Sequence, residues 1–304
     1  MANESTNQKT LGIKRLLVKI QFNEVLKVVD EIADSFPYAI IKGIPLSLMA
    51  YNDCYKRNIG DVDILINKEN IGPFDEILRN NGFKCNYRNR EEKLIALLYS
   101  HQTRPFLKDT PLYKTYVDVN YDIFWGEYTG KRVGIGSFLS DACEINIEGM
   151  SFRTLPPLKM LIAIILHHYK ETNSIYHLYT HNTIRKDMFY DVYKLIINNP
   201  DSITVKNLCD ACIQYGISAY AYYILYYTYF LFPDPILLQF VKELYSEEGK
   251  ALLDCFGLDE KERKRWKCDF LTRVNETDLK TLIMNQLTPT DLEKIERNKM
   301  IFGE

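Results

Sequence analysis

The chain has 304 residues, of which 46% are hydrophobic, so it can bury a substantial core in one or two domains. Its formal net charge is -2, which excludes an overall basic field that would attract nucleic acid or an anionic membrane. The seven cysteines follow no overall metal-ligand pattern, and their odd number favours free thiols in the cytoplasm over a disulfide framework. Cys209 and Cys212 have C-x-x-C spacing without a partner pair, which favours core cysteines over a zinc site.

The first third of the chain predicts alternating helices and strands. Residues 1–10 are polar and lack the apolar core of a secretory signal, and apolar spacing predicts a helix over residues 11–36. The run 38–43 predicts a strand that ends at a glycine, and a helix with Pro45 in its first turn follows. A second strand is predicted over 61–66, and then a helix over 71–83.

A third strand is predicted over residues 115–125, "TYVDVNYDIFW". Side chains alternate along a strand, so Asp118, Asn120 and Asp122 share one face and the apolar residues between them share the other. The polar face of this strand therefore needs a physical reason.

Beyond residue 159 the pattern is helical, with helices predicted over 160–170, 188–198, 205–215 and 219–232 and more after Pro235. We expect a domain boundary near Pro156, with an α/β domain at 1–155 and an all-helical domain at 156–304, which is an α+β chain. The uncharged run 211–233 is long enough to span a bilayer, but its tyrosine hydroxyls favour a buried helix, so no membrane partner is expected.

Two carboxylates stand at the head of the second strand. Asp61 and Asp63 are separated by one residue, so on a strand they point the same way, and their mutual repulsion favours a bound divalent cation. Mg²⁺ is the natural ion, because it is usually held by a few carboxylates and substrate phosphates. Asp118 could complete a site for two Mg²⁺ ions, which suits nucleotidyl transfer. The competing interpretation is a turn that runs into a strand.

A triphosphate cradle is the second element that such chemistry needs. "KGIPLS", residues 42–47, could supply it, because Gly43 lets the backbone approach a phosphate and the following helix start presents N–H groups. An ordinary turn is the alternative.

These features occur in the order of a known family. The stretch 40–83, "IIKGIPLSLMAYNDCYKRNIGDVDILINKENIGPFDEILRNNGF", resembles the uncharacterised nucleotidyltransferase family of the DNA polymerase β-like superfamily. The matching positions of its R-x-x-x-D-x-D-hydrophobic-L motif are Arg57, Gly60, Asp61, Asp63 and Leu65. Two positions depart from the pattern: Ile44 stands where a serine or second glycine is usual, and Asn120 where a histidine is usual.

The resemblance implies a nucleotidyltransferase-type α/β domain with a mixed sheet. Asp61, Asp63 and Asp118 would bind two Mg²⁺ ions, and Asp118 would also help to deprotonate the acceptor hydroxyl. Nucleotide contacts would come from Gly43 and the turn through Ser47, and from Lys42 and Arg57, although either cation could instead be solvated.

In the helical part, the resemblance implies counterparts of the family's histidine and of its Arg with a downstream Asp, at His167, Arg185 and Asp191. From the residues alone, a core histidine bonded to a neighbour such as Asp191 or Arg185 is favoured over a general base.

We therefore expect a metal-dependent enzyme that moves a nucleoside monophosphate from an NTP such as ATP to a hydroxyl of a small molecule, a protein or an RNA. The first alternative is an inactive member of the fold that acts as a binding or accessory protein in a peptide or natural-product pathway. The second is a toxin-like enzyme that modifies tRNA, against which the acidic net charge weighs.

Overall fold

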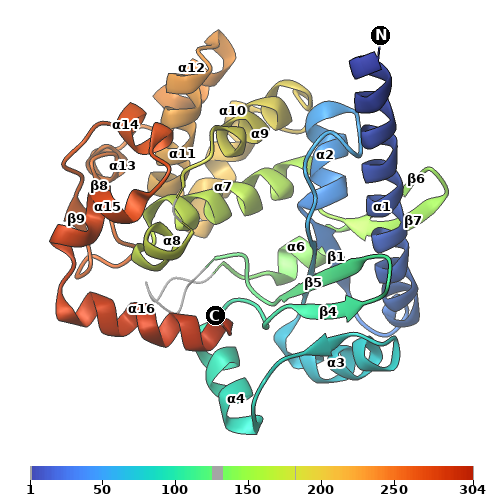
Figure 1. Cartoon of the computed structure of the whole chain (residues 1–304). Coiled ribbons are helices and arrows are strands. Elements are labelled where there is room, and N and C mark those ends of the chain that lie inside the picture. Colours follow the sequence, from blue (N-terminus) through green and yellow to red (C-terminus); the bar gives the residue numbers. More distant parts are fainter. Residues whose placement is uncertain (1, 125–132, 182, 304) are drawn as a thin grey trace. The chain divides into compact units, whose positions relative to one another are not determined.

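A computed structural model describes residues 2–124, 133–181 and 183–303, and it divides the chain into two compact units (Figure 1). The first unit comprises Met1–Lys93, Gln102–Tyr121 and Ile135–Pro156, and the second comprises Leu94–His101, Asp122–Gly134 and Pro157–Glu304. Two short segments that precede Pro156 thus group with the second unit, so the units do not separate at a single cut.

The first unit is built on a mixed sheet. In the described residues this sheet has seven strands in the order β3-β4-β5-β2-β1-β7-β6. Its parallel pairs are β1 with β7 and β2 with β5, and the other neighbours are antiparallel. The strands are β1 (Tyr38–Ile41), β2 (Val62–Ile66), β3 (Lys84–Cys85), β4 (Phe106–Asp109), β5 (Lys114–Asn120), β6 (Cys143–Ile147) and β7 (Met150–Thr154).

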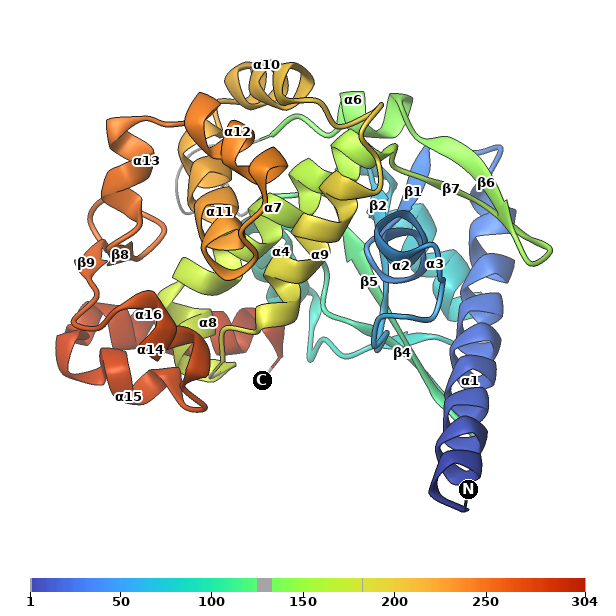
Figure 2. The same ribbon diagram turned by 90° about the horizontal axis from the view of Figure 1, so that it is seen from above.

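The central strands β1 and β2 are buried along their whole length, and all their residues except Asp63 are apolar or aromatic. The long helix α1 contacts β5 and β7, and Phe22 packs edge-on against Phe152 with ring centroids 5.0 Å apart. Figure 2 shows α1 running beside the sheet. The helices of this unit are α1 (Ala2–Ile32), α2 (Gly43–Tyr51), the 3-10 helix η1 (Lys68–Asn70), α3 (Ile71–Asn80) and α6 (Gly136–Ser140), and α4 (Arg90–Tyr99) continues into the second unit.

The strand predictions need two corrections at their ends. β2 begins at Val62, so Asp61 lies immediately before the strand. β5 stops at Asn120, because the chain turns there and the buried Asp122 carboxylate accepts the backbone N–H groups of Ile123 and Phe124. Asp122 therefore does not extend the polar face of β5, and Trp125 lies outside the described residues.

The second unit is mainly helical. α7, α9 and α11 contact one another and lie side by side (Figure 2), with the tyrosines of α11 largely buried. The helices are α7 (Pro157–Asn173), α8 (Ile175–Thr180), α9 (Lys186–Ile197), α10 (Val205–Tyr215), α11 (Ser218–Leu231), α12 (Pro235–Glu243), α13 (Glu247–Leu252), α14 (Phe270–Asn275), α15 (Leu279–Ile283), η2 (Met284–Gln286) and α16 (Pro289–Phe302).

The prediction of an all-helical region is wrong in one detail, because β8 (Cys255–Phe256) and β9 (Lys264–Arg265) form a two-stranded antiparallel sheet. None of the helices in the described ranges combines the length and the hydropathy needed to cross a membrane. The tyrosine-rich run is divided between α10 and α11 at Gly216, which adopts a left-handed backbone with φ of +64°.

An ion pair links the N-terminal cap of α16 to β9. Thr288 and Asp291 form a capping box at the start of α16, and Lys264 Nζ lies 2.8 Å from Asp291 Oδ2. Burial raises the pKa of Asp291, but the hydrogen bonds from Lys264 and Thr288 outweigh burial and hold it below its ordinary value. The ionised carboxylate therefore stabilises the folded chain.

We predict that Asp291→Asn lowers the free energy of unfolding by about 1 to 3 kcal/mol at pH 7, because the half-buried Lys264 loses the charge of its buried partner. The stabilisation by Asp291 is complete above its unfolded pKa of about 3.9 and is lost as pH falls through the lower folded pKa. Urea unfolding of both proteins at pH 7 and pH 3 should show the difference shrinking at acid pH. Glu296→Gln, which breaks an exposed pair on the same helix, should change stability little.

Candidate functional site

Strand register brings two of the predicted carboxylates together. β2 and β5 are parallel neighbours, and Asp63 and Asp118 are register partners across them. Register partners on adjacent strands project from the same face of a sheet, so the two side chains share one face. Asp63 is 3% exposed, whereas Asp118 is partly exposed.

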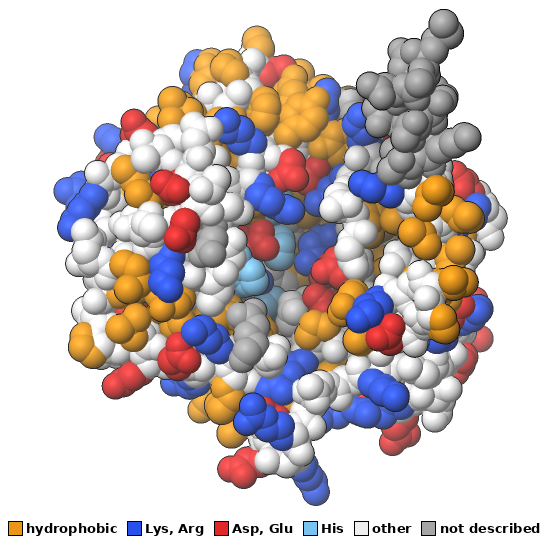
Figure 3. Space-filling view, viewed as in Figure 1, with side chains coloured by type: hydrophobic (Ala, Val, Ile, Leu, Met, Phe, Trp, Pro, Cys, Tyr) orange, Lys and Arg blue, Asp and Glu red, His pale blue; other side chains and the backbone are white. Residues whose placement is uncertain are grey.

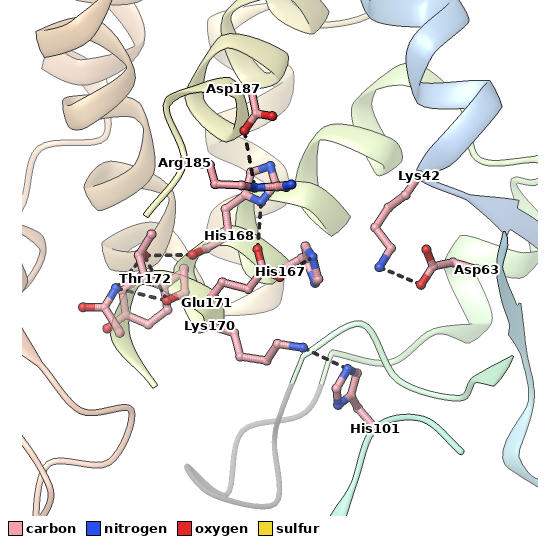
Figure 4. Close-up of polar contacts among 12 residues, drawn as sticks. Lys42, Asp63, His101, His167, His168, Lys170, Glu171, Thr172, Arg185 and Asp187 are labelled. Atoms are coloured by element: carbon pink, nitrogen blue, oxygen red, sulfur yellow. Dashed lines mark hydrogen bonds and ion pairs between the residues drawn. The ribbon is translucent and has the colours of Figure 1, made fainter. Parts of the chain in front are cut away.

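A lysine that directly follows β1 forms an ion pair with Asp63. Lys42 follows β1, and its Nζ lies 2.6 Å from Oδ1 of Asp63, as Figure 4 shows. Burial lowers the pKa of Lys42, but the negative charges of Asp63, Asp61 and Asp118 outweigh burial and raise it overall. The ammonium group therefore stays charged and partly neutralises the carboxylates.

The backbone at Lys42 is unusual for a residue with a side chain. Its φ of 56° lies in the left-handed region, and Gly43 follows with φ of 41°. Two successive residues with positive φ turn the chain sharply from β1 into α2. This turn places the first N–H groups of α2, which have no partner within a helix, next to the charged cluster.

Two amides that the sequence analysis did not assign a role hold the carboxylates in place. Asn120 Nδ2 donates to Asp63 Oδ1 at 3.2 Å, and Gln102 Nε2 donates to Asp118 Oδ2 at 3.4 Å. Asn120 stands where the family usually has a histidine, and its amide donates to the same oxygen that Lys42 contacts. The polar face of β5 was the available signal for Asn120, whereas no pattern marked Gln102.

Asp61 belongs to the same electrostatic cluster. Partial desolvation of its carboxyl and the negative charge of Asp63 raise its pKa, while the charges of Lys42 and Arg57 act in the opposite direction. The carboxyl group of Asp61 is at the exposed end of β2, so it remains open to solvent. The cluster therefore combines three carboxylates with two cations.

Gly43 is where a side chain would meet backbone strain but no crowding. A Cβ there would lie 3.7 Å from Ile59 Cγ2 and 3.8 Å from the carbonyl oxygen of Asp61, which is ordinary contact. Space is therefore available, and the positive φ is what favours glycine.

The sequence predicts Ser47 as a nucleotide contact. Its side chain is fully buried, its hydroxyl donates to the Asp53 carbonyl at 2.6 Å, and it accepts the Arg57 N–H at 3.2 Å. A hydroxyl used in this way is not available to a triphosphate. Ser47 instead tethers the loop 52–61 that carries Arg57 and Asp61.

Three residues are predicted in the helical part: His167 lies on α7, Arg185 directly precedes α9, and Asp191 lies on α9. His167 Nε2 lies 3.2 Å from Glu171 Oε1, a partner that the sequence analysis did not name. Arg185 Nε lies 3.5 Å from Asp187 Oδ1, as drawn in Figure 4, and Asp191 is buried.

The family of the chain follows from comparison with known proteins. The family described as "Uncharacterised nucleotidyltransferase" matches residues 12–233. The chain belongs to this family. Membership in the uncharacterised nucleotidyltransferases confirms the resemblance drawn from the motif around Asp61 and Asp63, and the mixed sheet with a helical C-terminal region confirms the expected fold class.

Among solved structures, the chain is similar to an antigenic nucleotidyltransferase-like protein from Paracoccidioides brasiliensis. The two are 16% identical with a TM-score of 0.35, over 60% of this chain and 75% of that one, which is too distant to carry an argument. No curated protein matches the chain.

We predict that Ser47→Ala lowers the free energy of unfolding by about 1 to 3 kcal/mol, because the part-buried Asp53 carbonyl and Arg57 N–H lose their shared partner. Chemical denaturation would measure the loss. Ser140→Ala, which removes an exposed hydroxyl from α6, is the matched control and should change stability by less than about 0.5 kcal/mol. A loss no larger than that of the control would contradict the tethering role.

Proposed function

We propose that the chain is a divalent-metal-dependent nucleotidyltransferase that moves a nucleoside monophosphate from an NTP to a hydroxyl acceptor. The observation that carries the proposal is the pairing of Asp63 and Asp118 as register partners on β2 and β5, with Lys42 Nζ 2.6 Å from Asp63 Oδ1. Three carboxylates this close to one ammonium group leave net negative charge at the end of β2. A bound cation would neutralise it.

The donor set fits Mg²⁺. Asp61, Asp63 and Asp118 offer only oxygen atoms, which hard divalent ions prefer, and the open position of Asp61 leaves room for water and phosphate ligands. When bound there, two Mg²⁺ ions would supply activation of the acceptor oxygen and charge neutralisation of the leaving pyrophosphate.

The chain's own residues would bind and orient the substrates. Lys42, which contacts Asp63 in this structure, would bind a phosphate oxygen of the NTP. The turn at Gly43 and the start of α2 would hold phosphate oxygens through backbone N–H groups. The backbone N–H of Arg57 donates to the Ser47 hydroxyl, and the Arg57 side chain would interact with the negative charge of the phosphates.

The proposed reaction forms a bond from the acceptor oxygen to the α-phosphorus of the NTP. The bond between the α-phosphorus and the bridging oxygen breaks, and pyrophosphate leaves with that oxygen. The proton of the acceptor hydroxyl would pass to Asp118, which Gln102 orients through its amide. The acceptor could belong to a small molecule, a protein or an RNA.

One observation favours the alternative of a binding or accessory protein without catalysis. Lys42 and Asn120 both already contact the same oxygen of Asp63, so the carboxylate is stabilised with no metal. A chain that keeps this pairing in the presence of Mg²⁺ and NTP would use the fold for binding alone.

Label transfer tests the proposed reaction. Purified protein with Mg²⁺, cell extract and each NTP labelled at the α-phosphate should give a labelled product and free pyrophosphate. Asp63→Asn should reduce product formation by at least about 100-fold, since metal binding and charge neutralisation each contribute several kcal/mol. Asp109→Asn, which changes an exposed aspartate on β4, should leave the rate unchanged.

Absence of labelled product with every NTP, together with no binding of Mg-NTP, would overturn the proposed activity. Binding of Mg-NTP without transfer would instead support the non-catalytic alternative.

Metal dependence of stability gives a separate test. Lys42→Met should destabilise the chain by about 3 kcal/mol in EDTA, because removing one partner leaves buried negative charge without compensation. Mg²⁺ should then raise the Tm of Lys42→Met more than that of the unsubstituted chain. An equal response of both proteins to Mg²⁺ would show that the ion does not bind at these carboxylates.

A further inference from the structure

A second group of ligand-type side chains lies in the helical unit. Among the residues that the structure describes, His167, His168 and Glu171 each place one ligand atom within 4.8 Å of the other two. All three come from α7, and Figure 4 shows the two imidazole rings on either side of the Glu171 carboxylate. Histidine side chains also gather in one place on the face drawn in Figure 3.

Two distances in this group are close to the ligand spacing of a metal-binding site. His167 Nε2 lies 3.2 Å from Glu171 Oε1, and His168 Nδ1 lies 3.8 Å from Glu171 Oε2. Two ligands about 2.0 Å from a tetrahedral zinc ion are about 3.3 Å apart. Small rotations of these side chains would therefore suffice to bring the three ligand atoms around one ion.

The buried ring of His168 is a second, independent indication of a metal site. Its side chain is 4% exposed, and neither ring nitrogen makes a hydrogen bond with the described residues. The hydrogen bond at this residue that the structure shows involves its backbone, whose carbonyl accepts from the Thr172 hydroxyl. A buried imidazole without hydrogen bonds is costly, and ligation of a metal by Nδ1 would satisfy one nitrogen.

An ion could reach the group from solvent. The side chains of His167 and Glu171 are 25% and 33% exposed, although His168 is buried. Three protein ligands of a tetrahedral ion leave a fourth position, which water or another ligand could fill.

We propose that His167, His168 and Glu171 form a binding site for a transition-metal ion of the zinc or cobalt type, separate from the carboxylates of the first unit. Imidazole nitrogen is a ligand that such ions accept readily, whereas Mg²⁺ prefers oxygen. The two sites therefore select different metals. This inference does not depend on nucleotidyl transfer.

Titration of the purified full chain with Co²⁺ after EDTA treatment tests the site. Four-coordinate cobalt absorbs much more strongly in the visible than six-coordinate cobalt, and thiolate ligation by any of the cysteines would add a charge-transfer band in the ultraviolet. We expect one equivalent to bind with visible bands and without that ultraviolet band. Glu171→Gln, which keeps the size of the side chain and removes its charge, should weaken binding by at least about tenfold.

Matched variants separate this site from other metal binding. His181→Gln removes an exposed histidine that directly follows α8. Asp61→Asn with Asp63→Asn removes carboxylates of the first unit, and both proteins should keep the bands. His167→Gln, at a partly exposed position, provides a second loss-of-binding variant if Glu171→Gln fails to fold.

Three results would overturn the proposal: no visible bands in the unsubstituted chain, unchanged affinity in Glu171→Gln or His167→Gln, or loss of the bands only when Asp61 and Asp63 are changed. Failure of the label-transfer assay would leave the cobalt spectrum unaffected, so the two proposals fail independently.

Discussion

The contact between Lys42 and Asp63 is the interaction on which the candidate site depends. Asp63 is almost fully buried, and a buried carboxylate requires a partner charge or several hydrogen bonds. Lys42 Nζ at 2.6 Å and the Asn120 amide at 3.2 Å provide both. The fold can therefore place Asp61 and Asp118 next to Asp63 without a metal, because one ammonium group offsets part of their repulsion.

The sheet creates this arrangement by joining segments that are distant along the chain. Asp63 and Asp118 meet because β2 and β5 are parallel neighbours, and Lys42 reaches Asp63 because β1 pairs with β2 from the other side. A shift of one residue in the register of β5 would turn Asp118 to the opposite face of the sheet. The left-handed backbone of Lys42 and Gly43 then directs the chain into α2 at the same end.

The helical unit has a different balance of positive and negative groups. In the helical unit, two imidazoles flank the Glu171 carboxylate. In the first unit, the Lys42 ammonium group interacts with three carboxylates. Oxygen-rich and imidazole-rich sites suit different ions, hard Mg²⁺ and borderline Zn²⁺ or Co²⁺ respectively. The two proposed sites would thus bind chemically distinct cations, one at a strand pair and the other on a single helix.

The sequence by itself determined the α+β class, the family and the central elements around Asp61 and Asp63, because hydrophobic period and short motifs are local properties. It did not determine where β5 ends, the β6-β7 hairpin, the buried role of Ser47 or the partners Gln102 and Glu171. Glu171 is one helical turn from His167, but many helices carry such pairs without using them. Only the tertiary structure decided these points, because burial and partner choice depend on packing between residues far apart in sequence.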